Sequence, residues 1–128
     1  MRIVKEYYGT HYVGEEPEMY QAILHDKKIE VTAYAKYNNG RITSFKQSGR
    51  LLTFSSVPNH EFIMTKNENK DFVVVEVSSG MIADYCIGNT YEKAMWYFIN
   101  YSGFMTYIND ENKLNEVIRK GMKICGRV

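Results

Sequence analysis

Cysteine, histidine and proline are scarce in this sequence. Its 128 residues include two cysteines, three histidines and two prolines. Cys86 and Cys125 do not form a Cys-x-x-Cys pair, and the histidines do not complete a zinc pattern with them. We therefore expect no metal site and no cofactor. The two thiols are expected to be reduced, or joined in a disulfide if their Cα atoms lie within about 7 Å.

The sequence also lacks an excess of charge of either sign and any long apolar run. Its 16 Lys and Arg residues against 15 Asp and Glu residues give a net charge of +1, which excludes a globally basic nucleic-acid coat and an acidic tail. Apolar runs such as residues 72–75 are too short to cross a membrane, and the N-terminus has no apolar core of signal-peptide length. We expect a cytoplasmic protein that contacts no membrane and binds no long nucleic acid specifically.

Catalytic and phosphate-binding motifs are missing as well. The chain has no G-x-S-x-G, H-E-x-x-H, G-x-G-x-x-G or G-x-x-x-x-G-K motif and no pair of H-x-[ST] motifs. His60, which precedes Glu61 at an expected loop-to-strand junction, is the best candidate for a general base. We expect His11 in a solvated loop and His25 in an exposed turn. No catalytic residue is predicted, and an enzyme that uses His60 or His11 as its base is an alternative.

The residues that are present are typical of one globular domain. Hydrophobic residues make up 45% of the chain and charged residues 24%, a balance that excludes wholesale disorder. The sequence has no internal repeat, no low-complexity tract and no linker. We therefore expect a single domain that spans residues 1–128.

The first two thirds of the chain predict strands. Residues 29–37 alternate between two faces, and the Asn39-Gly40 turn that follows predicts a hairpin with residues 41–46. A second hairpin is predicted between residues 61–65 and residues 71–77, and the latter run is rich enough in valine to be a central strand. The remaining expected strands and loops are strands at residues 2–8, 19–24 and 49–54, and loops at residues 9–17 and 55–59.

The last third of the chain predicts two helices. Asn89 precedes Glu92 by three residues, which is the signature of a helix start, and the first helix is expected from Thr90 to about Ser102. Residues 109–111 begin a second helix, whose apolar stripe is Leu114, Val117, Ile118, Gly121, Met122 and Cys125. The expected fold is α+β: an antiparallel sheet of about six to seven strands followed by two C-terminal helices packed on it.

Aromatic residues are abundant, with 11 Tyr, six Phe and one Trp. Part of this excess is local, at Tyr91, Trp96, Tyr97, Phe98, Tyr101, Phe104 and Tyr107. One sheet with two helices does not easily bury so many rings, and Tyr and Trp are common at interfaces. We therefore predict that part of this aromatic C-terminal region packs against another subunit, a copy of the same chain, in a homo-oligomer.

Positive charge gathers near the C-terminus, where residues 119–127 contain four cations and no acidic residue. Such a run commonly complements the helix dipole, and it can also meet phosphate. A nucleotide-like ligand would stack on aromatic rings and offer its phosphates to Arg, Lys and a helix N-terminus. The predicted ligand-binding residues are Asn89, Tyr91, Arg119 and Lys123, with Arg41 and Arg50 from the sheet as alternates.

In size, in its content of Lys, Asn and Tyr and in its sheet-then-helices order, the chain resembles small phage-encoded proteins that blunt bacterial defence. Its plan is similar to that of the oligomeric sponge proteins that sequester cyclic nucleotide signals. The resemblance implies a non-enzymatic, self-associating protein that sequesters a small nucleotide-like ligand, such as a cyclic nucleotide immune signal, in the host cytoplasm. The alternative is a protein–protein inhibitor of a host enzyme or nuclease, which predicts an exposed apolar or charged patch and no pocket.

Overall fold

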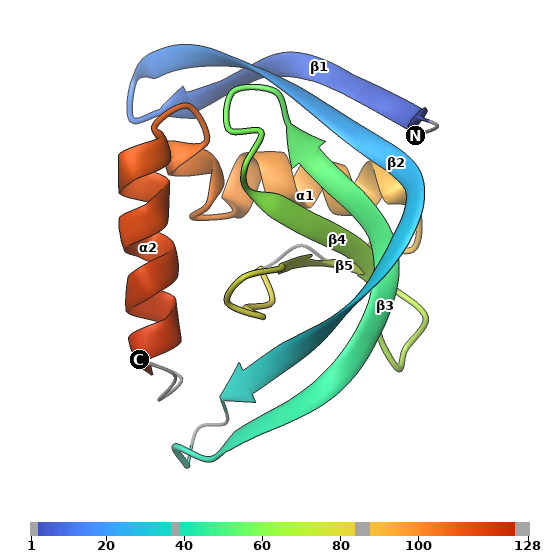
Figure 1. Ribbon diagram of the computed structural model, residues 1–128. Helices are drawn as coiled ribbons and strands as arrows, with labels where there is room; N and C mark the ends of the chain where they lie inside the picture. Colours follow the sequence, from blue (N-terminus) through green and yellow to red (C-terminus); the bar gives the residue numbers. More distant parts are fainter. Residues whose placement is uncertain (1–2, 37–38, 84–87, 125–128) are drawn as a thin grey trace.

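The computed structural model describes residues 3–36, 39–83 and 88–124, and it consists of an antiparallel sheet followed by helices (Figure 1). Each strand pairs with its neighbours along the chain, in the order β1-β2-β3-β4-β5. The strands are β1 Ile3–Val13, β2 Glu16–Lys36, β3 Ile42–Phe54, β4 Glu61–Lys66 and β5 Phe72–Glu76. The helices are α1 Tyr91–Tyr101, the short 3-10 helix η1 Met105–Tyr107 and α2 Glu111–Ile124. The predicted α+β fold is confirmed.

The sheet has five strands rather than six to seven because predicted neighbours merge. The runs at 19–24 and 29–37 both belong to β2, which continues through a register shift between Leu24 and Lys28. The runs at 41–46 and 49–54 likewise belong to β3. Gly49 lies at their junction, where a Cβ atom would overlap the Met64 carbonyl of β4, so this glycine allows close strand contact and does not end a strand.

The loop expected at residues 9–17 is also wrong for most of its length. Residues up to Val13 continue β1, and β2 begins at Glu16 after a tight turn in which Gly14 has φ +64. Gly9 lies inside β1, where a Cβ atom would come within 2.7 Å of the Tyr20 hydroxyl. The Tyr20 ring therefore lies over Gly9 across the β1–β2 pair, and this glycine does not mark a loop.

β5 lies at the end of the strand order and is not the central strand predicted for residues 71–77. Isolated bridges from Phe72 to Gly88 and from Val75 to Ile82 cover the side of β5 that faces away from β4. This cover explains why an end strand carries so many β-branched residues. The predicted hairpin partner is right, since β4 and β5 pair in antiparallel register.

The sheet curls back on itself through the turn that follows β5. The Glu76 amide donates to the Met81 carbonyl at 2.8 Å, and the Tyr34 amide of β2 donates to the Gly80 carbonyl at 2.9 Å. Gly80 has φ +71, and a Cβ atom there would overlap the Thr32 carbonyl, so the closure requires glycine at this position.

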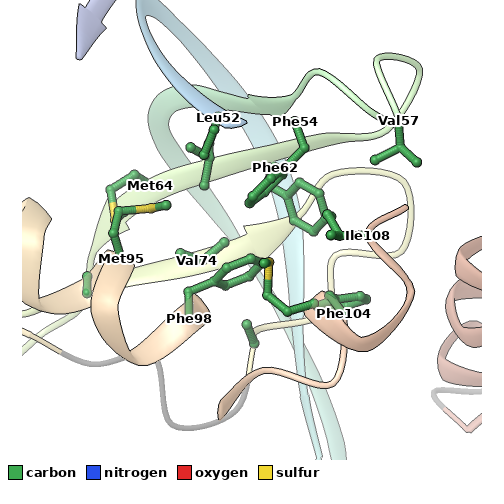
Figure 2. Packing of buried hydrophobic residues seen from close by; sticks show 14 of the residues in the cluster. Leu52, Phe54, Val57, Phe62, Met64, Val74, Met95, Phe98, Phe104 and Ile108 are labelled. Atoms are coloured by element: carbon green, nitrogen blue, oxygen red, sulfur yellow. The ribbon is translucent and has the colours of Figure 1, made fainter. Parts of the chain in front are cut away.

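Apolar side chains fill both faces of the curled sheet. The larger cluster lies between the sheet and the helices, and Phe62 is at its centre (Figure 2). The ring of Phe62 contacts those of Phe54, Phe98 and Phe104, with centroids 5.8, 5.6 and 5.5 Å away. A smaller cluster on the other face consists of Val31, Ala33, Ile63 and Val75. β5 is therefore buried on both faces, as its sequence predicts.

The helices begin close to where the sequence places them. The N-cap of α1 is Thr90 rather than Asn89, since Thr90 is extended and its Oγ1 accepts the Lys93 amide at 3.1 Å. Asp110 caps α2 by accepting the Lys113 amide at 3.1 Å. The buried part of the α2 stripe is Leu114, Ile118 and Gly121. Within the described ranges, neither helix is long and apolar enough to cross a membrane.

Candidate functional site

A cleft of about 360 Å³ opens between the middle of the sheet and the first turn of α1. It is lined by Lys28, Ser48, Gly49, Arg50, Met64, Thr65, Lys66, Phe72 and Tyr91. Small-ligand sites in proteins commonly have volumes of roughly 300–1,000 Å³, so this cleft is at the smaller end of that range.

Arg50 is the best-positioned cation of the cleft. Its Nε donates to the Tyr91 hydroxyl at 3.0 Å, and its Nη1 donates to Asp26 Oδ1 at 2.7 Å. The hydrogen bond to Asp26, followed by the one to Tyr91, raises the pKa of the guanidinium above its already high ordinary value. Within the described residues, two of the five N–H groups of this arginine are occupied in this way, which leaves three for a ligand. The side chain keeps 26% of its surface exposed, so a ligand from solvent can reach it.

The position of Asp26 results from the register shift in β2. Leu24 pairs with Leu52 and Lys28 pairs with Arg50, so β2 has two more residues than β3 between these pairs. A bulge of this kind bends a strand and re-aims its side chains. The extra residues bring Asp26 within hydrogen-bonding distance of Arg50. They also explain why the sequence around His25 looks like an exposed turn.

Two aromatic rings form one wall of the cleft. The centroids of Phe72 and Tyr91 are 4.4 Å apart, with 48° between the ring planes. Lys66 Nζ lies 5.1 Å from the centroid of Phe72, within the range of a cation–π contact. Both rings are half-buried, so part of their surface is available to a planar ligand.

The cleft has a positive electrostatic balance. Its cationic lining residues are Lys28, Arg50 and Lys66, and no acidic residue is among the described lining residues. Asp26, paired with Arg50, adds a negative charge beside them. A concave surface lined by three cations attracts anions.

The floor of the cleft is built from paired strands and not from loops. Arg50 of β3 pairs with Lys28 of β2 on one side and with Met64 of β4 on the other. The Thr65 hydroxyl donates to the Ser48 carbonyl at 2.7 Å and ties β4 to β3. Side chains on paired strands are held in more precise positions than side chains on loops, which favours a defined ligand geometry.

The structure brings together two of the six predicted ligand-binding residues, Arg50 and Tyr91. Asn89 precedes the α1 cap, is exposed and does not line the cleft. The other three are exposed elsewhere: Arg41 follows the turn between β2 and β3, and Arg119 and Lys123 lie on α2. Tyr91 is the first residue of α1, and α2 follows its far end, about 15 Å away along a helix of this length (Figure 1).

Sequence reasoning missed Lys28, Lys66 and Phe72 as lining residues. A signal for Lys28 is nevertheless present, because the hairpin around Asn39-Gly40 fixes a register. Continuing that register down the two strands pairs Lys28 with Arg50, as the structure does. Lys66 and Phe72 pair across the β4–β5 hairpin, and only the packing of β4 against β3 brings them to Arg50.

His60 lies at a different pocket, of about 270 Å³. The residue is buried, and its Nε2 has no hydrogen-bond partner among the described residues. Glu76, which lines the same pocket, uses its carboxylate to accept the Ser78 and Ser79 amides at 2.7 and 2.9 Å and the Ser78 hydroxyl at 2.5 Å. That carboxylate holds the turn after β5, so its lone pairs are largely engaged.

The other two histidines are within strands, contrary to the predicted loop and turn. His11 is in β1 and is buried, with its Nε2 3.8 Å from the Glu18 carboxylate. His25 is in β2, where its Nε2 lies 2.8 Å from the Thr53 hydroxyl and partial burial lowers its pKa. Cys86 and Cys125 lie outside the described residues. Within the described ranges, no group of three or more His, Cys, Asp and Glu side chains could hold a metal ion.

The aromatic residues of the C-terminal third divide into buried and exposed groups. Phe98 and Phe104 belong to the main core, whereas Trp96, Tyr97 and Tyr101 are 53%, 38% and 57% exposed. These last three rings, which we call the α1 aromatic cluster, contact one another with centroids 5.1 to 6.0 Å apart. Sheet and helices leave them uncovered, and their packing against a second subunit stays a prediction.

Comparisons of the chain with protein-family models, curated proteins and solved structures find no match. The functional argument therefore depends on the chemistry of the cleft. Three cations, two contacting rings and a floor of paired strands make this cleft a candidate site for a small anion that has a planar aromatic part.

Proposed function

We propose that the cleft binds a small nucleotide-like ligand and that the protein sequesters this ligand without converting it. The observation that carries the proposal is the position of Arg50, which is held by Tyr91 and Asp26 beside two further cations and two contacting aromatic rings. A nucleotide has both a phosphate and a planar base, so it is a chemical class that uses both halves of the cleft.

The phosphate is expected at the cationic half of the cleft. Arg50 has three N–H groups left after its two hydrogen bonds, and a guanidinium can bind two phosphate oxygens at once. Lys28 and Lys66 add positive charge on either side. The base is expected against the exposed ring surfaces of Phe72 and Tyr91, where stacking contributes about 1–3 kcal/mol per base.

The protein can act by sequestration if it binds its ligand tightly and if the cell uses that ligand as a signal. The resemblance to phage-encoded sponge proteins makes cyclic nucleotide immune signals the first ligands to test. Under this proposal the protein lowers the free concentration of the signal in the host cytoplasm, and no catalytic residue is needed.

A thermal-shift screen tests the proposal. The probes are cyclic mononucleotides, cyclic dinucleotides, isomers of cyclic ADP-ribose and inorganic phosphate. We expect at least one nucleotide to raise the melting temperature of the wild type more than phosphate does, because phosphate lacks the stacking part. The shift should be lost in Arg50→Gln and retained in Arg119→Gln, whose side chain is exposed on α2.

Two outcomes would overturn the proposal. In one, no nucleotide of the panel shifts the wild type. In the other, Arg119→Gln loses the shift as completely as Arg50→Gln does. The first outcome would favour the alternative of a protein–protein inhibitor, for which the α1 aromatic cluster supplies an exposed patch.

A further inference from the structure

β1 leaves one complete edge of the sheet without a strand partner. It is first in the strand order, and among the described residues it pairs with β2 alone. Its 11 residues make a long edge, longer than the strands of five to six residues that are usual in globular proteins. An exposed edge of this length is a template for pairing with another strand, unless it is covered or blocked.

A groove with a volume of about 400 Å³ lies between the β1–β2 pair and α1. Its lining residues are Lys5, Tyr7, Thr10, Tyr20, Glu92, Met95, Trp96, Ile99 and Asn100. Trp96 is also the first member of the α1 aromatic cluster, so the strand edge, the groove and the exposed rings form one continuous surface. The Tyr7 hydroxyl at the groove is buried and has no hydrogen-bond partner among the described residues.

We propose that two copies of this chain associate through the edges of their β1 strands. The two strands pair in antiparallel orientation about a two-fold axis, so the sheets of both copies become one continuous sheet. The added strand lies beside the groove and packs against Trp96 of the α1 aromatic cluster. The inference does not depend on the ligand proposed for the cleft.

The side chains of β1 select the position of the axis. An axis through Tyr8 places this tyrosine opposite the partner's Tyr8, which is a favourable aromatic pair, and it leaves the register shift between Ile3 and Lys5 outside the central part of the pairing. Tyr8 is 62% exposed, so its ring can pack in this way while its hydroxyl keeps its hydrogen bonds with Glu6 and Gln21. The same register places Glu6 opposite the partner's Thr10. Moving the axis to Glu6 would put two carboxylates opposite each other, which is unfavourable.

The area available supports an interface that includes both the edge and the rings. From their exposed fractions, the three rings of the α1 aromatic cluster offer roughly 200–400 Å² per copy, taking about 150–250 Å² for a whole ring. A stable interface buries about 800 Å² per partner, so the cluster alone is too small. An interface of that size therefore has to include the β1 edge and the exposed rings of Tyr8 and Tyr12 as well.

Charge does not oppose the association. Each copy has a net charge of +1. At the groove, Lys5 Nζ and Glu92 Oε1 form an ion pair 2.6 Å long within one copy, so neither has to be neutralised by the partner. Two copies can therefore approach without strong electrostatic repulsion.

Light scattering coupled to size-exclusion chromatography tests the inference through charges placed on the axis. Tyr8→Lys and Tyr8→Glu each put two like charges opposite each other, and we expect the dissociation constant of the dimer to rise at least tenfold in each variant. Mixing the two variants puts opposite charges at the axis and should restore the dimer. Ile42→Lys, a charge placed on an exposed apolar residue of β3, serves as the matched control and should stay dimeric.

Circular dichroism establishes that each variant is folded, which is expected because Tyr8 is exposed. The inference would be overturned if the wild type stays monomeric at a protein concentration 100-fold higher than 1 μM. A dimer that survives Tyr8→Lys, or that the mixture of Tyr8→Lys and Tyr8→Glu fails to restore, would overturn the proposed register. If Trp96→Ala abolishes a dimer that Tyr8→Lys leaves intact, the copies meet through the rings and not through β1.

Discussion

The two parts of the Tyr91 side chain have different roles, and two substitutions separate them. Tyr91→Phe removes the hydroxyl that accepts Arg50 Nε at 3.0 Å and keeps the ring 4.4 Å from that of Phe72. Tyr91→Ala removes both. Binding of the best nucleotide from the screen should therefore weaken in two steps, the first from a less well-held guanidinium and the second from the lost stacking surface.

The sizes of these steps follow from the geometry. Hydrogen bonds to charged groups contribute about 1.5–3 kcal/mol, but Arg50 is 26% exposed and keeps Asp26, so we expect about 0.5–1.5 kcal/mol for Tyr91→Phe. That corresponds to roughly 2- to 12-fold weaker binding. The ring contributes a further 1–3 kcal/mol or so, by the usual size of base–aromatic stacking, so Tyr91→Ala should bind at least about fivefold more weakly than Tyr91→Phe.

Isothermal titration calorimetry at fixed ionic strength measures both steps, and urea denaturation establishes that the variants are folded. Tyr101→Phe is the matched control, because Tyr101 is exposed at the other end of α1. Equal affinity of Tyr91→Phe and the wild type would show that the hydroxyl does not position Arg50. Equal affinity of Tyr91→Phe and Tyr91→Ala would show that no base stacks on this ring.

Three further predictions concern the fold. Gly80→Ala should lower the free energy of unfolding by about 2 kcal/mol or more in urea, because Gly80 has φ +71 and lies against the Thr32 carbonyl, whereas Gly103→Ala, in open space, should change it by less than about 0.5 kcal/mol. Phe98→Ala should cost about 3–5 kcal/mol in the same assay, since Phe98 is fully buried between other phenylalanine rings. Burial lowers the pKa of His25 from the ordinary 6.5, so the neutral form is favoured in the folded state. The free energy of unfolding should therefore fall as the pH decreases through 6.5, and this loss should be smaller in His25→Asn. Identical pH profiles of the wild type and His25→Asn would contradict the assignment.

The sequence predicts the fold class because hydrophobic periodicity and turn chemistry are local signals. Alternation over residues 29–37 and the Asn39-Gly40 turn are sufficient for the β2–β3 hairpin, and the apolar stripe from Leu114 is sufficient for α2. Strand ends are harder to predict. Gly9 and Gly49 look like breaks, but the β4 backbone leaves no room for a Cβ atom at Gly49, and Gly9 lies against the Tyr20 ring of β2. A single sequence does not contain that information.

The sequence predicts part of the candidate site as well, because residue type and hairpin register are also local signals. Arg50 and Tyr91 can be named from residue type, and hairpin register leads from Arg50 to Lys28. Lys66 and Phe72 reach the cleft through the packing of β4 on β3 and of α1 on the sheet, which are contacts between distant segments. Arg119 and Lys123 have suitable chemistry, but α2 holds them beyond the other end of α1 (Figure 1).

The most direct test of the account is to observe the arginine side chains during nucleotide binding. In a ¹H–¹⁵N spectrum of the arginine Nε–H groups, saturating nucleotide should shift the Arg50 resonance, because its guanidinium meets the phosphate. The resonances of Arg41 and Arg119, which do not line the cleft, should stay in place. If a nucleotide binds and shifts Arg119 while Arg50 is unchanged, the binding site is not this cleft and the central claim is wrong.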